Sequence, residues 1–140
     1  MSSTTSNIKI RILVVDDEPD ILLGLNALLA ARGHYVKTFD KPAQALEHLT
    51  SGDERYDLLI TDYRMPGGIS GLDLAKQLKE LARRRRRKTK VILMTAFDVL
   101  SLPEFNEALE LQIVDEIIQK PIPNDKLIAI IEKNFLHNNY

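Results

Sequence analysis

Short apolar segments of strand length recur along the chain, and a segment with helical periodicity follows each of them. Residues 8–15 read IKIRILVV, which begins by alternating and ends as a continuous apolar run, as is typical of a buried parallel strand. Shorter strands are predicted over residues 35–39, 57–61, 91–94 and 116–118.

The intervening segments repeat their apolar residues with the period of a helix. The first presents one apolar face and ends near Gly33, and the second opens at Pro42 and ends near Gly52. Leucines 74, 78 and 81 mark a third helix, residues 103–111 a fourth, and Asn124 is the expected cap of the last. Five repeats of strand then helix predict an α/β fold, a doubly wound five-stranded parallel sheet with helices on both faces.

Composition narrows the class of protein. A chain of 140 residues with 44% hydrophobic and 28% charged residues is one ordinary globular domain with a real core. The absence of cysteine excludes a disulfide scaffold, a thiol nucleophile and a cysteine-ligated metal. The longest nearly apolar stretch, residues 21–31, is too short for a transmembrane segment, and residues 1–7 lack the apolar core of a secretory signal. We therefore expect a cytoplasmic protein with a disordered tail over residues 1–7.

Basic residues are concentrated in one place. The stretch Arg83 to Lys90 holds seven of the 19 basic residues, so the rest of the chain has 12 basic against 20 acidic residues, a formal charge of −8. The run Arg83–Lys88 has two interpretations. It is either the solvated end of a helix, where cations suit the dipole, or a patch for nucleic acid, anionic lipid or an acidic partner.

Polar residues gather where the predicted strands end. Asp16 and Asp17 follow the first strand, Asp62 the third, Thr95 the fourth and Lys120 the fifth. In an open parallel sheet these ends meet at one edge, where ligands bind. Clustered carboxylates repel one another, and Mg²⁺ with oxygen ligands relieves that repulsion. A lysine suits a phosphoryl group, and an aspartate beside the metal is a plausible acceptor. The residues thus point to metal-assisted phosphoryl transfer to Asp62.

Four motifs carry a resemblance to a known family. The sequences LVVDDEP, ITDYRMP, MTA and QKP, in this order and spacing, resemble the receiver domain of two-component response regulators over residues 8–137. The resemblance implies a flavodoxin-like strand order, 2-1-3-4-5. It also implies that the peptide bond between Lys120 and Pro121 is cis.

The resemblance also implies roles for individual residues. Asp62 matches the phosphoacceptor, Lys120 the lysine that binds phosphoryl oxygens, and Thr95 the hydroxyl that turns toward them. The implied Mg²⁺ ligands are Asp17 and Asp62 directly, Asp16 largely through water, and Arg64 through its backbone carbonyl. Positions Arg64 and Phe97 flank the phosphoryl group in the family and control its lifetime.

Two departures from the family pattern concern signalling. Ile117 stands where the family usually has an aromatic residue that moves with the Thr95 hydroxyl as a switch. The segment from Thr95 to Lys120 is also longer than is usual in the family, and the helix in it is commonly part of the signalling face. A further departure, not tied to signalling, is the loop after Met65 and Pro66, which is about one residue longer than the common pattern.

The expected function is that of a phosphoacceptor in a two-component relay. A histidine kinase or histidine phosphotransfer protein would donate the phosphoryl group, and a downstream protein would read it by contact, because we expect no output domain. The chain would catalyse only its own phosphorylation and dephosphorylation and would not be an enzyme for other substrates. A phosphohydrolase acting on small molecules is disfavoured because it needs a second carboxylate two residues after the nucleophile, where Arg64 stands. The remaining alternative is a phosphorylation-independent binding module that uses Arg83–Lys88.

Overall fold

The chain folds as a single open sheet between two layers of helices. The computed structural model describes residues 8–96 and 102–136, so the expected tail over residues 1–7 and Phe97 lie outside the described residues. The strands are β1 (Arg11–Val15), β2 (Tyr35–Phe39), β3 (Leu58–Asp62), β4 (Lys90–Thr95) and β5 (Glu116–Gln119). All four pairings are parallel, and the order is β2-β1-β3-β4-β5, which confirms the predicted fold.

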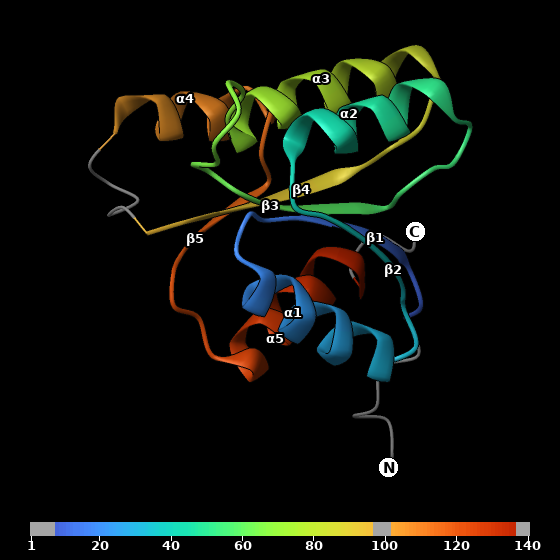
Figure 1. Cartoon of the computed structure of the whole chain (residues 1–140), viewed down its shortest axis with the longest axis vertical. Coiled ribbons are helices and arrows are strands. Elements are labelled where there is room, and N and C mark those ends of the chain that lie inside the picture. Colours follow the sequence, from blue (N-terminus) through green and yellow to red (C-terminus); the bar gives the residue numbers. More distant parts are fainter. Residues whose placement is uncertain (1–7, 97–101, 137–140) are drawn as a thin grey trace.

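Helices cover both faces of the sheet. They are α1 (Pro19–Ala31), α2 (Pro42–Ser51), α3 (Gly71–Arg84), α4 (Pro103–Glu110) and α5 (Asn124–Leu136). Figure 1 shows α1 and α5 on one face, and α2, α3 and α4 on the other. The expected cap Asn124 is instead the first residue of α5, because the carbonyl of Pro123 already accepts the first helical N–H bonds. Within the described residues, no helix has the length and apolar character needed to cross a bilayer.

Alternation along the strands divides the core into two layers. Leu13, Leu59 and Leu93 face the layer of α2, α3 and α4, whereas Ile12 and Ile60 face α1 and α5. Successive strand residues point to opposite faces, so both faces must be apolar when helices cover both. This is why β1 and β3 read as continuous apolar runs.

The first strand is shorter at its start than the sequence pattern predicts. It begins at Arg11 and not at residue 8. The backbone N–H of Ile10 donates to His34 Nδ1 at 3.1 Å, and the Ile10 carbonyl accepts from Tyr35 N at 3.0 Å. A side chain therefore takes the hydrogen bond that a neighbouring strand would have provided.

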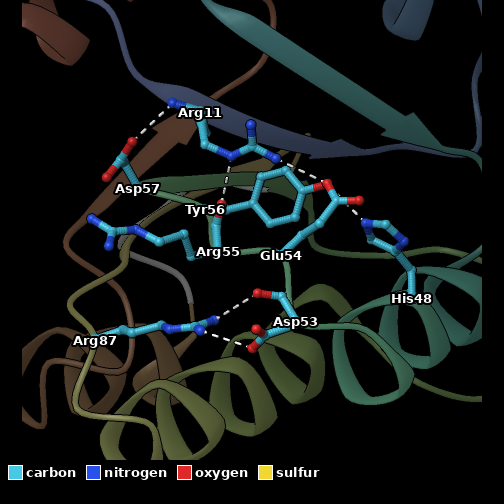
Figure 2. A network of polar contacts seen from close by, with 8 residues as sticks. All are labelled: Arg11, His48, Asp53, Glu54, Arg55, Tyr56, Asp57 and Arg87. Carbon is cyan, nitrogen blue, oxygen red and sulfur yellow. Dashed lines mark hydrogen bonds and ion pairs between the residues drawn. The ribbon is translucent and has the colours of Figure 1, made fainter.

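Polar contacts close the amino ends of β1 and β3 (Figure 2). Arg11 donates from its backbone N–H to Asp57 Oδ2 and from Nε to the Arg55 carbonyl, both at 2.8 Å, and its guanidinium pairs with Glu54 at 2.9 Å. The Tyr56 hydroxyl contacts Glu54 and the His48 ring of α2. One arginine thus holds the α2–β3 connection against β1, at the end of the sheet opposite the acidic residues.

Candidate functional site

Three carboxylates meet at the carboxyl ends of β1 and β3. Asp16 and Asp17 directly follow β1, and Asp62 is the last residue of β3. One oxygen from each of the three lies within 4.8 Å of the others. Asp16 is fully buried and Asp62 is 8% exposed, so little water screens their charges. The cluster results directly from the parallel pairing of the two strands.

Lys120 crosses from the end of β5 to this cluster. Its ammonium lies 2.9 Å from Asp16 Oδ2 and 3.2 Å from Asp62 Oδ1, with Glu18 at 3.5 Å. Its backbone N–H donates to the Thr95 carbonyl at 2.7 Å, which ties the end of β5 to β4. The Lys120–Pro121 peptide bond is cis. A single cation therefore bridges two of the three acids.

The electrostatics of the site follow from burial and crowding. Burial, followed by the negative charge of Asp16, raises the pKa of Asp62 above its ordinary value, although Lys120 opposes the shift. Burial acts to lower the pKa of Lys120, but its hydrogen bond to Asp16 and the nearby carboxylates outweigh that effect and raise it. The Lys120 ammonium thus stays charged, but its single positive charge does not balance the three carboxylates around it.

The donor set fits a hard divalent cation. Mg²⁺ is bound by one or two carboxylates and keeps positions for water and phosphate oxygens. Asp16, Asp17 and Asp62 supply oxygen atoms alone, and a second positive charge among them would relieve their repulsion. Arg64, whose carbonyl is the fourth expected ligand, directly follows Tyr63 in the loop after β3.

The two predicted switch positions lie on neighbouring strands. Thr95 ends β4, is 1% exposed, and follows Met94, the residue that pairs with Asp62. Ile117 pairs with Leu93 in the β4–β5 ladder and packs, partly buried, against the core under α4. The Arg64 side chain is exposed, and its guanidinium lies 5.9 Å from the centre of the Tyr63 ring.

Sequence reasoning missed two residues that position the site. Gly71 begins α3, and a Cβ atom there would lie 1.9 Å from the Asp62 carbonyl oxygen. The signal that could have located it is the capping box of Ser70 and Asp73, which starts α3 at this point. Tyr63 is the other residue, and its hydroxyl donates to the carboxylate of Glu104 in α4. No sequence pattern joins Tyr63 to Glu104, which is 41 residues away.

A groove of about 490 Å³ opens beside the acidic edge, between α1 and the start of α5. Lys120 and Glu18 line it on the side of the carboxylates, and Gly24, Leu25 and Ile122 line its apolar part. The groove thus reaches Lys120 of the site, whereas Asp16, Asp17 and Asp62 are not part of its lining.

The basic run, Arg83–Lys88, lies apart from the acidic edge, and its members contact different partners. Arg85 donates to the carbonyls of Leu49 and Thr50 at the end of α2, at 3.2 and 3.5 Å, and Arg87 pairs with Asp53 at 3.0 Å (Figure 2 shows Arg87 and Asp53). Arg83 and Arg84 pair with Glu80 on the surface of α3. The exposed members of the run are Arg83, Arg84, Arg86 and Lys88. Part of the run therefore fastens α2 and the α2–β3 connection.

Comparison with known proteins gives a consistent result. Residues 12–132 match the response regulator receiver domain. The chain is 35% identical over 124 residues to the DNA-binding transcriptional regulator NtrC of Escherichia coli (strain K12), covering 89% of this chain and 24% of NtrC. It is 35% identical over 118 residues to the sensory/regulatory protein RpfC of Xanthomonas campestris pv. campestris, covering 84% of this chain and 15% of RpfC. The chain thus spans about a quarter or less of these relatives.

Solved structures agree with the sequence matches. The response regulator TrrA of Thermotoga maritima, in complex with Mg²⁺-BeF, is 36% identical, with a TM-score of 0.66 over 88% of this chain and 96% of TrrA. A CheY-like receiver domain protein of Methanospirillum hungatei, at 23% identity, has a TM-score of 0.77 over 91% of this chain and 94% of its own, and shows the same fold.

Proposed function

Because the chain belongs to the response regulator receiver domain family, we propose that it accepts a phosphoryl group from a phosphohistidine onto Asp62, with Mg²⁺, and signals by protein contact. The observation that carries this proposal is the convergence of Asp16, Asp17 and Asp62 with the bridging ammonium of Lys120. The donor would be a histidine kinase or a histidine phosphotransfer protein, and a downstream protein would bind the modified form.

The proposed transfer is a displacement at phosphorus. A carboxylate oxygen of Asp62 forms the new P–O bond while the P–N bond to the donor histidine breaks, and the imidazole leaves with the electron pair. Lys120, already 3.2 Å from Asp62 Oδ1, is placed to hold the phosphoryl oxygens. Bound Mg²⁺ would neutralise part of the charge on the transferred group. Water later attacks phosphorus and restores Asp62, so the chain acts only on itself.

The metal site has a proposed division of labour. Asp17 and Asp62 would bind the ion directly, Asp16 would act largely through water, and Arg64 would provide its backbone carbonyl. The closeness of the three carboxylates supports this assignment, and the complex of TrrA with Mg²⁺-BeF supports the choice of ion. Asp16 is also the acid that Lys120 contacts most closely, which suits a less direct role.

We also propose that Arg64 and Phe97 shield the phosphoryl group from water and so lengthen its lifetime. The exposed position of the Arg64 side chain in the loop after Asp62 supports its part in this role. Truncating both side chains should accelerate the decay of the phosphoprotein about tenfold, which corresponds to a hydrolysis barrier lower by about 1.4 kcal/mol. The measurement is loss of phosphoprotein in Mg²⁺ after removal of the donor, and an equal or slower decay would contradict shielding.

The test of the proposed function is chemical labelling at Asp62. Incubation with acetyl phosphate and Mg²⁺ should add one phosphoryl mass to the wild type and none to Asp62→Asn. Asp125→Asn, which changes an exposed acid in the first turn of α5, is the matched control and should be labelled like the wild type. Full labelling of Asp62→Asn at the wild-type rate would exclude Asp62 as the acceptor. Failure of the wild type to bind beryllofluoride with Mg²⁺ would favour the phosphorylation-independent alternative.

A further inference from the structure

The residue after the phosphoacceptor reaches across to α4 with its whole side chain. Tyr63 is 8% exposed, and its hydroxyl donates to Glu104 Oε2. Its ring lies edge-on to the ring of Phe105, with centroids 5.0 Å apart and an interplanar angle of 81°. Glu104 and Phe105 both belong to the first turn of α4. One side chain thus contacts two successive residues at the start of this helix.

The backbone of Tyr63 is held from both sides. Its N–H donates to the Met94 carbonyl at 2.7 Å, and its carbonyl accepts from Gly71 N at 2.8 Å. These bonds fix the peptide between β4 and the start of α3. A shift of this peptide would therefore carry the Tyr63 side chain with it, and with the side chain its contacts to Glu104 and Phe105.

The position of Tyr63 relative to the proposed site makes such a shift relevant. Asp62, on one side, would carry the phosphoryl group, and Arg64, on the other, would offer its carbonyl to the metal. Loading the site thus acts on both neighbours of Tyr63. By contrast, the position three residues before Lys120 holds Ile117, which has no hydroxyl and is packed against the core under α4.

We propose that Tyr63, through its hydrogen bond to Glu104 and its contact with Phe105, couples loading of the phosphoacceptor site to the first turn of α4. The coupling rests on the proposed function of Asp62. A coupling between two sites is reciprocal, so a change that loosens the link must alter both the response of α4 to loading and the affinity of the site. A contact that only packs the core would alter stability and leave both of these quantities unchanged.

The test compares Tyr63→Phe with the wild type. The variant keeps the ring and its contact with Phe105 but removes the hydroxyl that reaches Glu104. Two quantities are measured: the affinity for beryllofluoride in saturating Mg²⁺, and the change that beryllofluoride causes in amide hydrogen exchange over residues 103–110. We expect the variant to change the affinity by about 3–10-fold and to reduce the exchange response of α4 to beryllofluoride. Tyr35→Phe, at an exposed tyrosine of the edge strand β2, is the matched control and should change neither.

A second variant separates the loss of the hydrogen bond from any effect that the Tyr63 substitution has on folding. Glu104→Ala removes the other partner, and the double variant with Tyr63→Phe should show no further change, because both substitutions break one bond. Wild-type affinity together with a wild-type response of α4 in Tyr63→Phe would overturn the coupling while leaving the proposed function intact. A wild type that binds no beryllofluoride would overturn both, and a wild type that binds it without any change in α4 would overturn the coupling alone.

Discussion

The absence of one methyl group at Gly71 makes room for the end of the phosphoacceptor strand. A Cβ atom at this position would meet the Asp62 carbonyl oxygen at 1.9 Å and the Thr61 hydroxyl at 3.0 Å. The first of these neighbours is backbone and cannot swing away. The Gly71 amide in turn donates to the Tyr63 carbonyl. The start of α3 therefore packs directly against the backbone of the phosphoacceptor residue.

Adding that methyl group should disturb both stability and labelling. We expect Gly71→Ala to lower the free energy of unfolding by about 1–3 kcal/mol, as overpacking does, and to slow labelling at Asp62. Gly24→Ala is the control, because a Cβ atom there meets nothing within 4 Å, and in mid-helix it should stabilise by about 0.5–1 kcal/mol. Urea unfolding and acetyl phosphate labelling measure the two effects. Equal stability and labelling of Gly71→Ala and the wild type would contradict this account.

The crowding of carboxylates gives a second prediction for a single residue. Asp17→Asn removes one negative charge from the cluster while keeping its size. We expect Mg²⁺ affinity to fall by about tenfold or more, and the metal-free protein to unfold at the same or a higher temperature, because repulsion is relieved. Titration with Mg²⁺ and thermal unfolding in a chelator give the two values. Unchanged affinity would remove Asp17 from the set of ligands.

At the scale of elements, the residue that follows α3 caps the carboxyl end of α2. The last carbonyls of a helix have no partner within the helix, and Gly52, which follows α2, has an extended backbone with φ −107° that forms no left-handed cap. Arg85, just past the end of α3, donates to two of these carbonyls. Its positive charge also suits the negative end of the α2 dipole. The two helices are thus joined by one guanidinium in addition to their apolar contacts.

Replacing that arginine should therefore cost more than replacing its neighbour. We expect Arg85→Ser to lower the free energy of unfolding by about 1 kcal/mol, and Arg84→Ser to change it by less than about 0.5 kcal/mol, since the pair of Arg84 with Glu80 is exposed and long at 3.9 Å. Chemical denaturation of the two variants under one set of conditions makes the comparison. Equal losses of unfolding free energy in the two variants would show that Arg85 stabilises the fold no more than an exposed surface arginine does.

At the scale of the whole molecule, the sequence pattern was sufficient for the parallel sheet with helices on both faces and for the position of the acidic residues, whereas the strand order was predicted from the family resemblance. The inner strands β1 and β3 are apolar on both faces, and acidic residues stand at their carboxyl ends, as Lys120 does after β5, so the parallel sheet brings Asp16, Asp62 and Lys120 to one edge. Contacts between side chains far apart in the sequence could not be predicted. Tyr63 and Glu104 have no shared periodicity. Which arginines turn inward depends on local backbone geometry such as the positive φ of 56° at Arg86, an uncommon conformation outside glycine.

The stability of the whole fold should depend on the neutral form of His34. Burial, with the charges of Arg32 and Lys9, lowers the pKa of His34 below its ordinary 6.5, whereas Glu132 opposes the shift. A proton on Nδ1 would also remove the acceptor that the Ile10 N–H uses. The folded chain thus resists protonation more than the unfolded chain. The stabilisation is present above pH 6.5 and is lost as pH falls toward the folded pKa.

We expect the free energy of unfolding to fall more steeply between pH 7.5 and 5.5 in the wild type than in His34→Gln. One proton limits the extra slope to about 1.4 kcal/mol per pH unit, and solvent near this partly exposed ring makes it smaller. Urea unfolding at the two pH values gives the difference, and all other titrating groups are common to both proteins. Parallel pH profiles would show that His34 contributes nothing to the dependence.

The anchored basic run also has a consequence for proteolysis. Six consecutive arginine and lysine residues, 83–88, are the densest target for trypsin in the chain. In the folded protein, however, the amides of Arg85 and Arg87 donate to the carbonyls of Leu81 and Ala82, and their side chains are held by α2 and Asp53. A protease needs an extended segment, so we expect cutting within the anchored residues 83–87 to wait for the end of α3 and the turn after it to detach. The rate of nicking at this run then reports how often that end opens, as a local free energy separate from global unfolding.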